Sequence, residues 1–313
     1  MTEGGNTMSI AKSFSKITTD DTLLENKQHG DTAFPFQYYY EDIWKFEFHC
    51  IDWHWHPELE IVYVQTGQMK CFIGDETTIL DKGSALLINA RVIHRFEAKE
   101  MTKIPNAVFS PLLFASEESF IYKEYILPFL SGGQSFQLFD PAIPWQANCI
   151  YHIKKLFEFQ HSAQTLQLYI ISRLFDFWEA LYPHLHFDIC NKSDFNHRTD
   201  QTRVQMMMQF IHSNYNKEIN LGDISQTVLI GKSTVLRLFH RYIHISPIAY
   251  LIQYRLKKAA RMLSSTEKKI SVIAKETGFR SDGYFCRKFK EFYGVSPQTY
   301  RKEPSKKGNA NIF

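Results

Sequence analysis

Several residues able to do chemistry gather in one short stretch of this sequence. His54, His56 and Glu60 lie within seven residues, Gly67 follows, and His94 comes 27 positions after that glycine. Residues i and i+2 of a β-strand face the same side, so one continuous strand would direct the first three side chains into a common lumen. With His94 from another strand, three imidazoles and one carboxylate would form a donor set suited to manganese, iron, nickel or zinc.

This spacing resembles the cupin pattern, His-x-His-x3-Glu-x6-Gly followed by a second segment with its own histidine. The resemblance implies a small β-barrel of the jelly-roll type. The second segment departs from the pattern of cupin enzymes, because Asn89 stands where proline is usual and Ser84 where an acidic residue is common. Three interpretations of the four side chains stay open: a metal site, polar groups lining an effector pocket, and structural hydrogen-bonding residues. Cupin barrels attached to regulators often keep such residues without metal, so no cofactor is expected and a divalent metal is the less favoured alternative.

Aromatic residues accompany the cluster along the sequence. The rings are Trp53, Trp55, Tyr63, Phe72 and Phe96. They suit a pocket for a small polar ligand, including a sugar stacked on an aromatic face, and they suit an aromatic barrel core equally well. The residues predicted to bind an effector are His54, His56, Glu60, Tyr63 and His94.

Short strands must position these side chains. Between residues 34 and 110, apolar and alternating runs are punctuated by glycine at the spacing of a sandwich or barrel. The predicted strands span 43–51, 59–65, 69–73, 77–80, 84–88, 94–96 and 104–109. Helical periodicity follows, with predicted helices at 122–130, 141–159 and 165–182. The last of these is too apolar to have only one covered face, which favours a contact between the subunits of a homodimer.

Charge divides the chain into an acidic and a basic part. Residues 1–202 carry 16 Lys and Arg against 26 Asp and Glu, whereas residues 203–313 carry 20 against 7. A basic module joined to an acidic one indicates that only the second module meets a polyanion.

The basic part contains an internal repeat of 50 residues. Arg, Phe, Ser, Pro and Tyr recur in register at 237/287, 239/289, 246/296, 247/297 and 250/300. In each copy a serine is placed as an N-cap and a proline at the first helical position, so one helix ends and another begins. The predicted helices span 204–215, 221–228, 232–242, 247–263, 270–277, 282–293 and 297–302. The pairs within 221–242 and 270–293 each have the form of a helix-turn-helix.

The runs at 270–279, 284–290 and 294–301 resemble the signature of AraC-type (AraC/XylS) transcriptional regulators, over about residues 203–302. The resemblance implies a sequence-specific DNA-binding regulator, an effector-responsive activator of uptake or catabolism genes. It implies a homodimer whose partners are double-stranded promoter DNA, RNA polymerase and a small-molecule effector, with a sugar as one candidate. The chain is not expected to be an enzyme; the alternative function is a metal-dependent cupin enzyme fused to a DNA-binding module.

In that family two recognition helices enter successive major grooves. The positions matching base contacts are Ser233, Leu236 and Arg237 in the first helix and Asp282, Gly283, Cys286 and Arg287 in the second. An arginine here can bind guanine O6 and N7, and a leucine can pack on a thymine methyl. Either arginine can instead belong to a structural salt bridge. Asp282 either accepts from cytosine N4 or caps its helix, and the cap is favoured.

Five further residues are predicted to bind DNA. Lys232 and His240 lie on the exposed face of the first recognition helix, and Arg241, Lys288 and Lys290 are predicted phosphate contacts. Because the second copy has Gly283 where the first has Ser233, we expect the first helix to carry more of the base discrimination.

The predicted fold is therefore an α+β protein with two domains. A cupin-like jelly-roll barrel with flanking helices precedes an all-α domain that contains two helix-turn-helix units. The predicted boundaries are a mobile arm at 1–30, an effector-binding barrel at 31–140, a helical dimerisation segment at 141–183, a linker at 184–202, a DNA-binding domain at 203–303 and a tail at 304–313.

Cysteine usage and hydropathy indicate the compartment. The five cysteines are scattered without a Cys-x-x-Cys, which favours free thiols in a reducing environment. The N-terminus lacks the apolar core of a signal peptide, and no apolar stretch approaches the length of a membrane span. We expect a cytoplasmic bacterial protein that associates with the nucleoid and not with a membrane.

Overall fold

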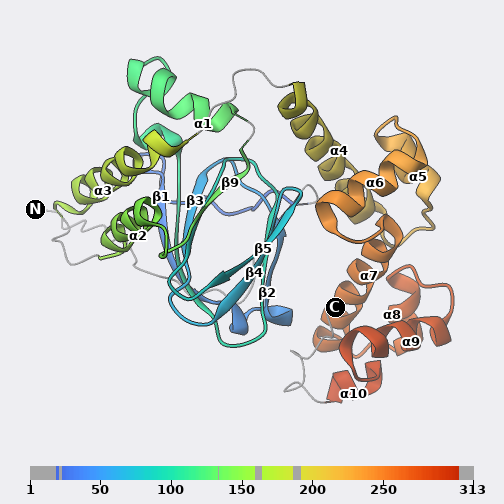
Figure 1. The fold of residues 1–313 in the computed structure, drawn as a ribbon. Coiled ribbons are helices and arrows are strands. Elements are labelled where there is room, and N and C mark those ends of the chain that lie inside the picture. The colour runs from blue at the N-terminus through green and yellow to red at the C-terminus, as the bar shows by residue number, and fades with distance from the viewer. Residues whose placement is uncertain (1–18, 21–22, 133, 159–163, 186–191, 303–313) are drawn as a thin grey trace, which may run out of the picture. The chain divides into compact units, whose positions relative to one another are not determined.

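The computed structural model describes residues 19–20, 23–132, 134–158, 164–185 and 192–302, with side chains of 192–198 excepted (Figure 1). Contacts divide the chain into two compact units, of which residues 25–46 and 50–198 form most of the first and residues 199–313 most of the second. The predicted α+β architecture with a β domain followed by a helical domain is confirmed. Residues 1–18 of the predicted arm and the whole predicted tail lie outside the described residues.

Within the described residues, the strands of the first unit form two antiparallel sheets. One sheet has the order β1-β8-β3-β6-β9 and the other the order β2-β7-β4-β5. The strands are β1 Phe36–Asp42, β2 Cys50–His54, β3 Leu59–Tyr63, β4 Gln68–Ile73, β5 Glu76–Asp81, β6 Ala85–Ile88, β7 His94–Ala98, β8 Lys103–Phe109 and β9 Phe136–Phe139. Apolar side chains of both sheets, among them Val62, Met69 and Phe96, pack together between them.

Alternation along β3 divides its side chains between two cores. Val62 faces the opposite sheet, whereas Leu59 and Ile61 belong to a second core beneath helices α2 Pro144–Leu156 and α3 Leu166–Leu181. In Figure 1 these two helices lie side by side next to the strands that they cover. Full burial of one such aliphatic side chain contributes about 1.5–3 kcal/mol. The strand is therefore held from both faces, which fixes the direction of Glu60.

Three predictions for residues 34–140 are wrong in detail. Residues 43–49 form two short 3-10 turns, η1 Ile43–Lys45 and η2 Glu47–His49, in place of a strand. Phe48 and His49 have φ of 62° and 51°, which an extended strand cannot accommodate. Strands β1 and β9 were not predicted, and β9 is a four-residue edge strand. The remaining short helices are η3 Pro111–Leu113, η4 Tyr122–Ile126, α1 Leu127–Ser131 and η5 Tyr182–His184.

The second unit is helical throughout its described part. Its helices are α4 Lys192–Asn214, α5 Leu221–Thr227, α6 Lys232–Ile243, α7 Pro247–Ser265, α8 Ile270–Glu276, α9 Asp282–Tyr293 and α10 Pro297–Lys302. Helix α4 begins twelve residues before the predicted start at 204, so the predicted linker is helical from Lys192 onward. Its first residues are polar and lack apolar periodicity, which concealed the helix. None of the described helices is both long and apolar enough to cross a lipid bilayer.

The 50-residue sequence repeat corresponds to a repeat in how aromatic side chains pack. Phe239 and Phe289 are fully buried, and each contacts the tyrosine that follows eleven residues later. The ring centroids are 5.5 Å apart for Phe239 and Tyr250 and 5.4 Å apart for Phe289 and Tyr300, both edge to face. The two copies therefore hold their recognition helices, α6 and α9, on the same aromatic scaffold.

Serine side chains begin the helices that follow each copy, as predicted. The Ser246 hydroxyl accepts from the Ala249 backbone N–H at 3.2 Å, and the Ser296 hydroxyl accepts from the Thr299 N–H at 3.1 Å. Helix α7 then runs for 19 residues, about 28 Å, between the two helix-turn-helix units.

A glycine in the second helix-turn-helix turn is required by its surroundings. Gly278 has φ of 85°, and an added Cβ would lie 2.5 Å from the Tyr215 carbonyl oxygen and 2.9 Å from the Arg255 guanidinium. Arg255 is itself fixed, because its Nε donates to the Tyr215 carbonyl at 2.6 Å and its Nη2 to the Lys217 carbonyl at 2.7 Å. Neither obstacle can move without breaking a hydrogen bond.

We expect Gly278→Ala to destabilise the second unit by about 1–3 kcal/mol, because it combines a left-handed backbone with a backbone overlap. Far-UV circular dichroism during urea denaturation measures this loss. Gly283→Ala is the control, since its Cβ would meet only the Ser281 hydroxyl at 3.8 Å. A glycine-to-alanine change inside a helix is favourable by up to about 1 kcal/mol. Equal stability of the two variants would contradict the role of Gly278.

Candidate functional site

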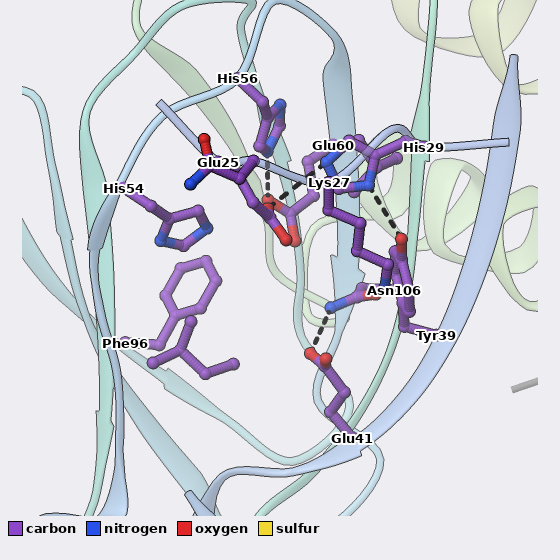
Figure 2. Close-up of a pocket in the computed structure, with 13 residues that line it drawn as sticks. Glu25, Lys27, His29, Tyr39, Glu41, His54, His56, Glu60, Phe96 and Asn106 are labelled. Atoms are coloured by element: carbon purple, nitrogen blue, oxygen red, sulfur yellow. Dashed lines mark hydrogen bonds and ion pairs between the residues drawn. The ribbon is translucent and has the colours of Figure 1, made fainter. Parts of the chain in front are cut away.

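The first unit contains a cavity of about 370 Å³ (Figure 2). Both sheets contribute to its lining, with Glu41, Glu60 and Asn106 from the larger sheet and His54 and Phe96 from the smaller one. This volume and the mixture of charged, amide and aromatic groups are typical of a site for a small polar molecule.

The segment before β1 completes the lining. Glu25, Lys27 and His29 all border the cavity, and Figure 2 draws them over the strands. His29 Nδ1 lies 2.9 Å from the Tyr39 hydroxyl, and the Glu25 backbone N–H donates to the Trp55 carbonyl at 3.0 Å. These residues belong to the pocket and not to a mobile arm. Their contacts are polar, so no apolar periodicity marks them in the sequence.

The structure brings His54, His56, Glu60 and His94 together at one wall of the cavity. One ligand-type atom from each lies within 4.8 Å of the others, and all four residues are buried. The route differs from the predicted continuous strand. His54 lies in β2 and Glu60 in β3, which belong to different sheets, and His56 lies in the connection between them. His94 pairs directly with His54 across strands β7 and β2.

Backbone carbonyls orient all three imidazoles. The Nδ1 atoms lie 2.8 Å (His54), 3.2 Å (His56) and 2.9 Å (His94) from carbonyl oxygens two residues away in the chain. A carbonyl only accepts, so Nδ1 carries the proton in each contact and Nε2 of a neutral ring has a free lone pair. The Nε2 atoms of His56 and His94 lie 3.2 and 3.1 Å from one Glu60 oxygen.

Burial and neighbouring charges shift the pKa values of residues in and beside this wall of the cavity. Burial, assisted by nearby His94, lowers the pKa of His54 to about 3. Burial would raise the pKa of Glu60, but the contacts with His56 and His94 hold it below the ordinary value. Burial likewise opposes ionisation of Glu25, whereas its interaction with His29 holds that pKa below the ordinary value. Two carboxylates therefore border the three imidazoles.

The pKa of Glu41 is shifted in the opposite direction from that of Glu60 and Glu25. Burial raises its pKa to about 8, the negative charge of Glu60 adds to the shift, and the Asn106 side-chain N–H, which donates to Glu41 at 3.0 Å, opposes it. The folded protein thus keeps a proton on Glu41 that the unfolded chain releases at the ordinary pKa of 4.5. Stability contributed by this group is present below pH 4.5 and falls as the pH rises to about 8.

Glu41→Gln is expected to flatten this dependence and to make the first unit more stable than the parent at pH 8. The slope removed is at most about 1.4 kcal/mol per pH unit. All five tryptophans lie between residues 44 and 178, so tryptophan fluorescence during urea denaturation at pH 5 and pH 8 reports this unit. Glu118→Gln, at a carboxylate that is 91% exposed, is the control and should behave as the parent. An unchanged slope in Glu41→Gln would contradict the assignment.

Most of the aromatic rings predicted near the pocket lie elsewhere. Phe96 lines the cavity, whereas Trp53 and Phe72 pack on each other with centroids 5.8 Å apart. Tyr63 packs on the core under α2 and α3. It lies three residues after Glu60 on β3 and therefore faces the opposite side of the sheet, so its prediction as an effector contact is wrong.

Helix α6 presents the predicted polar face to solvent. Val235, Leu238, Phe239 and Tyr242 are buried, and the exposed residues on the other side are Lys232, Ser233, Leu236, Arg237 and His240. Arg237 forms no ion pair with any residue that the structure describes. Arg241 is half-buried, with its guanidinium 5.8 Å from the Tyr242 ring.

Helix α9 presents Asp282, Gly283 and Arg287 to solvent, with Cys286 half-buried among them. The Arg287 side chain is 67% exposed, and its Nε lies 4.0 Å from the Glu291 carboxylate. Such an exposed pair is worth at most about 1 kcal/mol, so it leaves the guanidinium available. Lys288 pairs with Glu291 at 2.7 Å, and Lys290 is exposed.

The predicted cap of α9 is wrong by one residue. The Ser281 hydroxyl accepts from the Tyr284 backbone N–H at 3.3 Å and is the N-cap, so Asp282 occupies the first turn with its carboxylate exposed. A carboxylate there still interacts favourably with the positive end of the helix dipole.

Models of two protein families match the two units. Residues 43–168 match an AraC-like ligand binding domain, and residues 224–303 match a helix-turn-helix domain. The chain belongs to the AraC family. This AraC-family regulator is 26% identical to the uncharacterised HTH-type transcriptional regulator YdeC of Bacillus subtilis over 287 residues, 90% of this chain and 97% of the relative.

Two further relatives of this AraC-family regulator carry more informative names. The HTH-type transcriptional activator RhaS of Pectobacterium carotovorum is 23% identical over 253 residues, 80% of this chain and 87% of the relative. The Melibiose operon regulatory protein of Escherichia coli is 30% identical over 119 residues, 36% of this chain and 39% of the relative. The AraC-family chain is thus a DNA-binding transcription regulator with a ligand-binding domain.

Proposed function

We propose that this AraC-family regulator activates transcription of uptake or catabolism genes when a small polar effector occupies the cavity of its first unit. The cavity carries the proposal, because a polar, largely buried hollow with ionised carboxylates is a costly feature to maintain without a ligand. Relatives named as an activator and as a melibiose operon regulator support activation and a carbohydrate effector. RNA polymerase is the partner that activation requires.

Base recognition is assigned to the exposed faces of α6 and α9. Arg237 and Arg287 are the proposed guanine readers, with Leu236 against a thymine methyl. Lys232, Lys288, Lys290 and Arg241 are the proposed phosphate contacts. Helix α6 presents Ser233 where α9 presents Gly283, so base changes under α6 should cost more affinity than base changes under α9.

Dimerisation is assigned to the outer surface of α2 and α3. Leu168 of α3 is 70% exposed and Tyr151 of α2 is 53% exposed, and Phe175, seven residues after Leu168 on α3, is 36% exposed. Apolar side chains in such number on paired helices favour a contact with a second subunit.

The experiment uses the full-length chain. DNA fragments from upstream regions of its own genome are selected for binding at fixed salt, and the bound fragment is then transcribed in vitro with RNA polymerase. Candidate sugars are added, and an increase in transcript supports the proposal. Failure to enrich any fragment over competitor DNA, or transcription indifferent to every metabolite that shifts the thermal unfolding of the chain, would refute it.

A further inference from the structure

The cavity of the first unit is lined by more hydrogen-bond acceptors than donors. His56 and His94 both contact one Glu60 oxygen, Oε2, and His29 contacts Oε2 of Glu25. The Oε1 atoms of Glu25 and Glu60 make no hydrogen bond or ion pair with the residues that the structure describes. Both residues line the cavity (Figure 2), so two carboxylate oxygens are available to a ligand.

Asn106 and His54 add two further acceptors to the lining. Asn106 is 3% exposed, and its side-chain N–H donates to Glu41, whereas its Oδ1 has no hydrogen-bond partner. His54 Nδ1 lies 2.8 Å from the Asp52 carbonyl, so Nε2 of the neutral ring carries a lone pair. A buried acceptor without a donor is destabilising, and a ligand with several N–H groups would remove that cost.

Few donors balance these acceptors. The lining contains one lysine and no arginine, and the Lys27 ammonium lies over the Tyr39 ring, 3.8 Å from its centroid. The Tyr39 hydroxyl lies 2.9 Å from His29 Nδ1. The carboxylates of Glu25 and Glu60 therefore outnumber the single lysine, and a buried charge needs a partner of opposite sign. This balance favours a cationic ligand over an anionic one.

An ammonium group is the chemical complement of this acceptor-rich hollow. It has three N–H donors and no lone pair, whereas a hydroxyl sets its own lone pairs against some of the acceptors. Hydrogen bonds from a charged donor to a carboxylate are also stronger than hydrogen bonds between neutral groups. We propose that the effector is a small organic amine whose ammonium group binds Glu25, Glu60 and Asn106. This step rests on the proposed effector function.

Apolar side chains at the same cavity can accommodate the carbon skeleton of such a ligand. Ile51, Phe96 and Val108 line the cavity beside the polar groups, and Lys27 supplies a donor for a hydroxyl oxygen. An amino sugar combines an ammonium group, hydroxyls and a carbon ring. It is also a carbohydrate, so it is the class of amine that we expect first.

Matched probes that differ in one kind of charged group test this inference on the full-length chain. Glucosamine, glucose and glucuronate share a sugar ring, and putrescine, butanediol and succinate share a four-carbon chain. Tryptophan fluorescence follows thermal unfolding of the first unit with each probe at equal concentration near neutral pH. We expect the amine of at least one set to raise the unfolding temperature more than the neutral and anionic members of that set.

Two variants locate the ammonium group. Glu25→Gln and Glu60→Gln should each weaken binding of that amine at least about 10-fold, because one charge-assisted hydrogen bond is lost. Glu118→Gln, at a carboxylate that is 91% exposed, is the control and should bind the amine as the parent does. Unfolding curves without probe show whether each variant is folded. Unchanged amine binding in Glu25→Gln would overturn the assignment, even if Glu60→Gln does not fold.

A protonated His56–His94 pair is the competing explanation, because it would make this wall cationic and select an anion. Stabilisation by glucuronate or succinate in preference to the amines, or no stabilisation by either amine, would overturn this inference. Promoter binding and transcription in vitro are measured in parallel. The proposed function fails if the chain binds no promoter fragment or if no metabolite alters transcription. A neutral or anionic effector that raises transcription contradicts only the amine.

Discussion

Replacing Arg237 and Arg287 together by alanine is expected to lower the affinity of the chain for its promoter fragment at least about 30-fold. Each bidentate arginine–guanine contact discriminates by about 1–3 kcal/mol, and two such contacts at separate helices should add. Both side chains lie exposed on recognition helices, and neither takes part in a buried ion pair. Their removal should change stability by no more than about 0.5 kcal/mol, so the loss reports recognition and not unfolding.

Fluorescence anisotropy at fixed salt, on the promoter fragment and on random DNA, measures this effect. If the arginines read bases, the double variant loses affinity mainly for the promoter. If they contact phosphates, it loses affinity on both DNAs and the salt dependence falls by about one ion per arginine. Lys82→Ala with Lys123→Ala removes two positive charges from the first unit and should leave affinity nearly unchanged. No change in the double arginine variant would refute the assignment of the base readers.

Phe289→Ala is expected to destabilise the second unit by about 3–5 kcal/mol, the largest stability effect that we anticipate. Phe289 is fully buried, and its ring centroid lies 5.6 Å from Phe285, 4.4 Å from Tyr293 and 5.4 Å from Tyr300. Removing it leaves an aromatic cavity between α9 and α10 that neighbouring rings cannot fill without leaving their own contacts.

The two units can be followed separately in this experiment. Far-UV circular dichroism should show an early transition for the second unit, whereas tryptophan fluorescence, confined to the first unit, should keep its midpoint. Val272→Ala on α8, at a side chain that is 40% exposed, is the matched control and should cost less than about 1 kcal/mol. A fluorescence midpoint that moves with the dichroism would contradict separate unfolding of the units.

The helices of the second unit were predicted well because local sequence patterns determine where they begin and end. Period-3.6 patterns, serine caps and prolines at first helical positions set α5 to α10 within one or two residues. Local patterns did not predict two features correctly, the start of α4 and the N-cap of α9. Helix α4 extends into a polar stretch that has no apolar pattern. The N-cap of α9 is Ser281, one residue earlier than the expected Asp282, because the Ser281 hydroxyl accepts from the Tyr284 backbone N–H.

The pocket was predicted only in part because its members come from distant segments. The His–Glu spacing correctly indicated residues that meet, but a motif cannot reveal that β2 and β3 enter different sheets. The alternation of side chains along β3 would by itself have excluded Tyr63 from the predicted effector contacts, because Tyr63 and Glu60 face opposite sides of the sheet. Glu25, Lys27, His29 and Asn106 carry no motif, and only the folded arrangement brings them to the cavity.

The half-buried Cys286 thiol on α9 allows a chemical reagent to be attached to the second recognition helix. Cys50, Cys71 and Cys149 are buried and Cys286 is half-buried, so Cys286 is the most accessible cysteine in the described part of the chain. In a Cys190→Ser background, an iron-chelate reagent attached to Cys286 would cleave the DNA strand beneath α9. The cut sites would map the operator register of that helix on unaltered DNA.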